Sequence, residues 1–125
     1  MLKKFLSLLF LPLLLAGCNA TLNNLTPQQQ VRNADNLYPV EIAFTSHQQT
    51  MRWQSIRSEI VVGPEFYKMR PTPLMTNRWE GLIFVPPGTS AVNYRYKVTY
   101  DYNAMGAPRT DSIRSPEYTL RIVDK

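Results

Sequence analysis

The feature that most constrains the fold is the stretch over residues 92–102, in which apolar and polar side chains alternate strictly. One parity carries only valine and tyrosine, and the other carries asparagine, arginine, lysine, threonine and aspartate. Alternation with a period of two, in β-branched and aromatic residues, predicts a strand with one buried face. Because a strand with an aromatic face needs a second sheet to cover it, the stretch predicts an antiparallel β-sandwich.

Shorter segments of similar character lie on both sides of this stretch. The sequence predicts strands at residues 37–45, 59–62, 66–69, 78–85 and 117–123, with residues 50–53 continuing the first strand or pairing with it. The run over residues 82–85 is apolar on both parities, as expected of an interior strand. Residues 70–73 predict an edge or a loop because they contain two prolines, and residues 103–115 predict a loop.

These segments predict an all-β fold of about six or seven strands, an antiparallel immunoglobulin-like β-sandwich without a convincing helix. Val85-Pro86-Pro87-Gly88-Thr89, followed by Tyr94-Arg95-Tyr96-Lys97-Val98, resembles the corner between strands E and F of fibronectin-III-like and early-set immunoglobulin-like domains. The resemblance implies that Tyr94 or Tyr96 is a corner tyrosine whose hydroxyl bonds to nearby backbone. The antibody cysteine pair is absent, so the resemblance is to the disulfide-free members.

The N-terminal residues have the pattern of an export signal. Lys3 and Lys4 precede an apolar run over residues 5–15, which is shorter than the about 20 residues that a membrane-spanning helix needs. Small residues then lead to the single cysteine of the chain. Leu15-Ala16-Gly17-Cys18 resembles the lipobox of bacterial lipoproteins, after which residues 1–17 would be removed as a signal peptide.

The resemblance implies that signal peptidase II cleaves before Cys18, that the thiol of Cys18 carries a diacylglycerol, and that its amine carries an acyl chain such as palmitate. Residue 19 is Asn rather than Asp, and an Asp there retains enteric lipoproteins in the inner membrane. The resemblance therefore implies anchoring in the outer membrane, at its periplasmic face or at the cell surface. No cofactor is expected besides this covalent lipid.

Residues 18–36 are polar and lack apolar periodicity, so they predict a flexible tether between the lipid and a sandwich domain over residues 37–125. Removal of residues 1–17 leaves 12 Lys and Arg against 9 Asp and Glu, a net charge of +3. The basic residues are spread along the chain, which argues against a nucleic-acid partner.

Catalytic residues are not predicted. His47 is the only histidine, and a triad would need it to act with Ser46 and Asp101. Adjacent residues of a strand point to opposite faces, which argues against cooperation of Ser46 with His47. A zinc site would need carboxylates alone, so no metal site is predicted either.

Aromatic residues are stronger candidates for a binding surface. Trp53, Trp79 and Tyr67, with the neighbouring Arg52 and Arg78, could form a platform for stacking sugar rings, or the aromatics could fill the core between the sheets. Core filling is favoured for the tyrosines of residues 92–102. The main hypothesis is a non-enzymatic envelope lipoprotein that acts as a binding or assembly subunit, through an exposed strand edge or an aromatic-arginine surface. Its partner would be an envelope protein or a cell-wall polymer; the alternative is a carbohydrate- or peptidoglycan-binding module.

Overall fold

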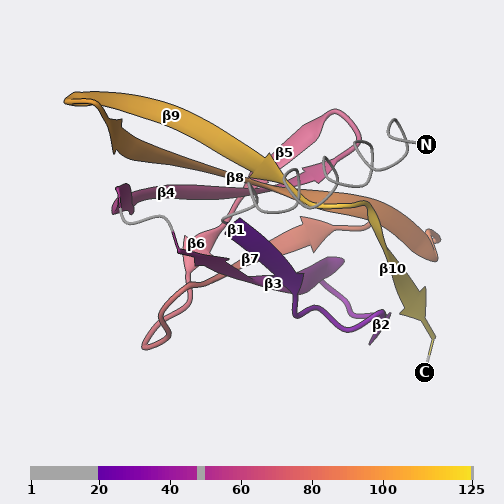
Figure 1. Cartoon of the computed structure of the whole chain (residues 1–125). Helices are drawn as coiled ribbons and strands as arrows, with labels where there is room; N and C mark the ends of the chain where they lie inside the picture. Colours follow the sequence, from indigo (N-terminus) through magenta and orange to yellow (C-terminus); the bar gives the residue numbers. More distant parts are fainter. Residues whose placement is uncertain (1–19, 48–49, 125) are drawn as a thin grey trace, which may run out of the picture.

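The computed structural model describes residues 20–47 and 50–124 (Figure 1). The predicted export signal, the lipobox and Cys18 lie outside these residues. Within them the chain is all-β, and no helix long and apolar enough to cross a membrane is found.

Ten strands occur in the described part of the chain. They are β1 (Ala20–Asn24), β2 (Gln29–Val31), β3 (Leu37–Ser46), β4 (Met51–Val62), β5 (Glu65–Lys68), β6 (Arg70–Pro71), β7 (Arg78–Phe84), β8 (Ala91–Ala104), β9 (Ala107–Arg114) and β10 (Tyr118–Val123). One sheet has the order β1-β3-β7-β6, and the other has the order β2-β10-β8-β4-β5, with β9 also paired to β8. The pairings in this part are antiparallel apart from the parallel pairing of β2 with β10. The predicted all-β class and its two sheets are therefore confirmed.

The hydrophobic core lies between the two sheets and is built on β8. Its buried residues include Tyr94, Tyr96, Val98 and Tyr100, the alternating set predicted for this strand. Alternate residues of β3 are also buried, and the ring of Phe44 lies 6.0 Å from that of Tyr100. The tyrosines of residues 92–102 thus fill the core.

The predicted segments 50–53 and 59–62 belong to one strand, β4, whose pairing with β8 is interrupted by a bulge. Arg52 pairs with Asp101 and Arg57 pairs with Thr99, so four residues of β4 lie opposite a single residue of β8. The hydroxyl of Ser55 accepts a hydrogen bond from the Asp101 N–H at 2.8 Å. The Ser55 side chain therefore replaces the main-chain acceptor that an unbulged strand would offer to the Asp101 N–H.

The prediction of a loop over residues 103–115 is wrong. β8 continues to Ala104 and pairs with β9 around a two-residue turn. Both turn residues have positive φ, 48° at Met105 and 81° at Gly106, as in the primed turns whose twist suits a hairpin. Pro108 is tolerated because β9 is an edge strand, paired only with β8 among the described strands.

The expected tether over residues 18–36 differs from the structure at residues 20–31. β1 pairs along β3, from Ala20 with Ser46 to Asn24 with Ile42, and β2 pairs with β10. The polar composition that predicts a tether is here compatible with short edge strands. The folded domain therefore begins no later than Ala20.

Side chains of this N-terminal segment bond to the buried tyrosines of β8. The Tyr96 hydroxyl donates to Asn24 Oδ1 at 2.7 Å and lies 2.9 Å from Thr26 Oγ1, while Asn24 Nδ2 donates to the Tyr94 hydroxyl at 3.0 Å. Thr26 Oγ1 in turn accepts the Glu41 N–H at 2.9 Å. The expected corner bond to nearby backbone is thus wrong, because a distant segment of the chain supplies the partners.

Burial holds the Tyr96 hydroxyl in its protonated, donating form. The ring is completely buried, and this desolvation raises the pKa of the hydroxyl well above its usual range. The main-chain groups of Tyr96 are bonded as well: its N–H donates to Ser115 Oγ at 2.8 Å, and its carbonyl accepts the Ser115 N–H at 3.0 Å. Tyr96 therefore joins β8, the end of β9 and the N-terminal segment.

The variant Tyr96→Phe removes this hydroxyl and leaves the shape of the ring unchanged. We expect the free energy of unfolding to fall by about 1–3 kcal/mol, because Asn24 and Thr26 lose a buried hydrogen-bond partner. Urea denaturation measures the loss. The control Tyr102→Phe removes a hydroxyl that has no hydrogen bond with a described residue, and should change stability by less than about 0.5 kcal/mol. Equal losses in the two variants would contradict the role given to Tyr96.

Candidate functional site

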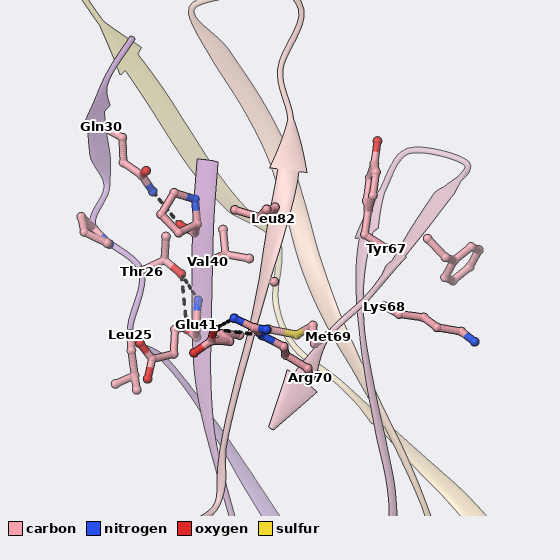
Figure 2. A pocket seen from close by; sticks show the side chains of 15 residues that line it. Leu25, Thr26, Gln30, Val40, Glu41, Tyr67, Lys68, Met69, Arg70 and Leu82 are labelled. Carbon is pink, nitrogen blue, oxygen red and sulfur yellow. Dashed lines mark hydrogen bonds and ion pairs between the residues drawn. The ribbon is translucent and has the colours of Figure 1, made fainter. Parts of the chain in front are cut away.

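A groove of about 1030 Å³ runs over the four-stranded sheet. Its floor comprises residues 39–41 of β3 and residues 80–82 of β7. One wall is formed by residues 25–27 with Gln30, and the other by residues 66–70. Figure 2 shows Thr26 and Gln30 on one side of β3, and Tyr67 and Lys68 beyond β7. The groove thus lies between the N-terminal segment and the connection from β5 to β6.

The N-terminal wall is fixed to β3 by hydrogen bonds. Gln30 Nε2 donates to the Pro39 carbonyl at 2.8 Å, and the Leu25 N–H donates to the Glu41 carbonyl at 2.9 Å. The Thr26 hydroxyl is held between Glu41 and the core tyrosine Tyr96. The wall is therefore part of the domain and does not depend on a ligand for its position.

An apolar strip that faces away from the core runs from the floor of the groove, at Pro39 and Leu82, to Leu37 and Phe84 beyond its end. Leu37 pairs with Phe84, and Pro39 pairs with Leu82. Leu82 and Phe84 are 49% and 46% exposed, while the alternate residue Ile83 is completely buried. β7 lies between β3 and β6 in its sheet, as expected of an interior strand, but only its core face has a second sheet against it.

The edge of β7 beside the strip is open. β6 pairs with β7 only at Trp79 and Glu80. The Val85 N–H donates to the carbonyl of Asn36, directly before β3, and the Arg78 carbonyl accepts the Thr72 N–H on the opposite side. Even-numbered residues of β7 therefore direct their main-chain groups away from β3. Beyond Glu80, Leu82 and Phe84 therefore present N–H and C=O groups that no described strand covers. Such an edge can accept an extended segment as an additional strand.

In the described part of the chain, the charged groups that line the groove are ion-paired, apart from Lys68. Arg70 donates to Glu80 Oε2 through Nη2 at 2.9 Å and Nε at 3.2 Å, and Arg78 lies 3.7 Å from Glu41. The Tyr67 hydroxyl donates to Glu65, and this bond raises the pKa of Tyr67. A groove with paired charges and an apolar floor favours an uncharged, extended ligand over a polyanion.

The structure separates the two tryptophans predicted as a surface. Trp79 is 7% exposed and lies in the core, whereas Trp53 is 46% exposed in the irregular part of β4. Both contact the ring of Phe44, with centroids 6.3 Å and 6.2 Å away. They share a packing partner but no exposed platform.

The remaining predicted residues lie in three places. Tyr67 lines the groove, Arg78 is ion-paired with Glu41 at its margin, and Arg52 is exposed at the start of β4. The structure thus brings only Tyr67 and Arg78 near the groove.

The histidine and the acid of the imagined triad have separate environments. His47 is exposed directly after β3. The Asp101 carboxylate accepts a hydrogen bond from Thr110 at 2.8 Å and lies 3.4 Å from Arg57, and these two partners, Thr110 first, lower its pKa. Among residues 20–47 and 50–124, no cluster of three His, Cys, Asp or Glu residues is suited to hold a metal ion.

Sequence reasoning missed the apolar strip and the N-terminal wall. The signal for the strip was present in the run over residues 82–85, since an apolar residue on the second face can be exposed as well as buried. The wall had no comparable signal, because Thr26 and Gln30 are ordinary tether residues by composition. Its position depends on tertiary hydrogen bonds.

Comparison with protein-family models, with curated proteins and with solved structures finds no match to this chain.

Gly81 in the groove floor allows the close approach of the two sheets. A Cβ atom at this position would lie 2.9 Å from Ile60 Cδ1 and 3.3 Å from Met69 Cγ. We expect Gly81→Ala to lower the free energy of unfolding by about 1–3 kcal/mol through overpacking. Combination with Ile60→Val, which removes the contacting methyl group, should cost less than the sum of the two single variants. Additive losses in urea denaturation would show that this contact is not the cause.

Proposed function

We propose that the chain is a lipoprotein of a bacterial envelope that acts as a non-enzymatic binding or assembly subunit. Its anchor is the lipid on Cys18, attached after cleavage at the sequence Leu15-Ala16-Gly17. Its location is the outer membrane, at the periplasmic face or the cell surface. The lipobox, directly after an apolar run of signal-peptide length, supports the anchor.

The observation that carries the binding function is the open edge of β7 beside an apolar strip. An extended segment of an envelope protein would bond to the main chain of Leu82 and Phe84. Its alternate side chains would pack on the strip formed with Leu37 and Pro39. The two carboxylates that line the groove, Glu41 and Glu80, are each ion-paired with an arginine, which supports binding rather than acid–base catalysis.

The strand order supports an immunoglobulin-like architecture for this domain. The order β1-β3-β7-β6 corresponds to strands A-B-E-D, and the order β10-β8-β4 corresponds to G-F-C. In this assignment β7 is strand E and β6 is strand D. Strand D is too short to cover the whole edge of strand E. Sandwiches of this kind serve many unrelated functions, so the groove and not the architecture identifies the activity.

A carbohydrate- or peptidoglycan-binding module is the second candidate, and the partly exposed Trp53 is the observation in its favour. A sugar platform would have to be built from Trp53 without Trp79, because Trp79 is packed in the core. One aromatic ring offers a single stacking contact. The β7 edge therefore supports a protein partner better than a polysaccharide.

The lipid anchor is tested by the mass of the chain from bacterial membranes. We expect a mature chain that begins at Cys18 and carries a diacylglycerol and an acyl group. The variant Cys18→Ala should retain its signal peptide and incorporate no labelled palmitate. An unmodified chain cleaved at another position would contradict the anchor.

The groove is tested by a photoreactive residue placed at Leu82 of the full chain in the cells that produce it. We expect a discrete crosslinked product with an envelope protein, and its loss when Phe84→Asp is added, because a carboxylate disrupts the apolar strip. The matched control carries the photoreactive residue at Thr119, which is exposed on β10 in the other sheet. The same product from Thr119, or none from Leu82, would contradict the proposed docking edge.

A further inference from the structure

One end of the domain contains the beginning of β1 and two turns. Ala20 is paired with the last residue of β3. Asn103 in β8 donates its N–H to the carbonyl of Thr50, directly before β4, and Asn77 accepts an N–H from the same end of β3. The start of β1, the turn over residues 72–77 and the β8–β9 turn therefore belong to the same end of the sandwich, with the two turns at its opposite corners (Figure 1), and we call this region the β1 end. The β8–β9 turn and the start of β4 are at the left of Figure 1.

The two turns of the β1 end carry large apolar side chains in an unusual conformation. Leu74 and Met105 are completely exposed, and their φ angles are 63° and 48°. Asparagine and glycine adopt this left-handed conformation more readily than leucine or methionine. These side chains are not packed within the described domain and are available for a contact outside it. Trp53, at the start of β4, is partly exposed at the same end.

Exposed cations accompany these apolar side chains. Arg52 precedes Trp53, and Arg109 pairs with Tyr102 in the β8–β9 hairpin. Both arginines are exposed, and neither joins the ion pairs found among the described residues. Asp101, the nearest acid on β8, is held by Arg57. Besides Thr110 and Arg57, the charge of Arg52 contributes to the lowered pKa of this carboxylate without forming an ion pair. Tryptophan, aliphatic tips and exposed arginines are the combination suited to the surface of an anionic bilayer.

The position of Cys18 in the sequence places a bilayer within reach. Cys18 lies two residues before Ala20, a span of at most about 7 Å. Met105 lies three residues beyond Tyr102, the partner of Met51 at the start of β4, so the hairpin extends about 10 Å past that strand. Because the spacer is short, an anchored domain holds this end of the sandwich, with the projecting hairpin, close to the lipid surface.

We infer that the β1 end docks on the surface of an anionic phospholipid bilayer. Trp53, Leu74 and Met105 enter the headgroup region, and Arg52 and Arg109 face the lipid phosphates. The inference rests on the proposed lipidation of Cys18, which holds the β1 end at the membrane. Docking would also give the domain a fixed orientation on the membrane, with the groove held beside the lipid surface.

The test uses the mature chain coupled through its single cysteine to a maleimide lipid in vesicles of phosphatidylcholine and phosphatidylglycerol. This coupling supplies the anchor whether or not cells lipidate Cys18, so failure of the inference is distinguishable from failure of the proposed anchor. Brominated lipids quench tryptophan that enters the headgroup region. We expect quenching of Trp53 and none of the buried Trp79, so Trp53→Phe should abolish the quenching.

The double variant Leu74→Asn and Met105→Asn keeps a residue type suited to positive φ while removing the apolar tips. We expect it to lose the quenching, and the matched control Leu82→Asn, in the groove, to retain it. Replacement of Arg52 and Arg109 by Gln should lower quenching on anionic vesicles to the level seen with phosphatidylcholine alone.

Absence of quenching in the wild-type chain, or equal quenching in the double variant, would overturn the docking. Equal quenching on neutral and anionic vesicles would overturn the choice of an anionic surface. Sedimentation without vesicles detects a dimer. A dimer in which Trp53 is buried would instead assign the β1 end to a contact between two copies.

Discussion

The buried hydroxyl of Tyr96 joins parts of the chain that are far apart in the sequence. It lies on the central core strand β8 and bonds to Asn24 and Thr26, while the Tyr96 main chain bonds to Ser115. A buried hydroxyl needs such partners, because an unsatisfied one costs more free energy than the bond itself contributes. The hydrogen bonds of this core tyrosine, together with the pairing of β1 with β3 and of β2 with β10, therefore hold the N-terminal segment in place.

This segment then serves the site as well as the core. Held by Tyr96 and by the main chain of β3, residues 25–30 form one wall of the groove. These residues follow β1, which begins two residues after the cysteine that we propose as the lipid anchor. A domain attached through so short a spacer has little freedom to move away from its membrane, in contrast to one on a coil of about 18 residues, which would reach roughly 20–25 Å. Core, groove and proposed anchor are thus connected through one short stretch of chain.

The core strands could be predicted from the sequence, but the edge strands and the open edge of β7 could not. Strict alternation identified β8, because side chains that alternate along a strand face opposite environments, and β3 and β10 followed from the same pattern. The β8–β9 hairpin was missed because Gly106 and Pro108 suggest a loop, although a primed turn needs positive φ and an edge strand tolerates proline. The open strip at Leu82 and Phe84 was missed because apolar residues on two faces suggest burial on both. Contacts that depend on tertiary pairing, such as those of Thr26, have no local signal at all.

Hydrogen exchange of the mature chain is the most direct measurement, since the account depends on residues 20–31 being part of the folded domain. Peptides covering β1 and β2 should exchange far more slowly than an unstructured chain and lose protection when Tyr96 is replaced by Phe. Exchange of these peptides at the rate of an unstructured chain, with β8 still protected, would show a free tether and would contradict the account of both the groove and the anchored end.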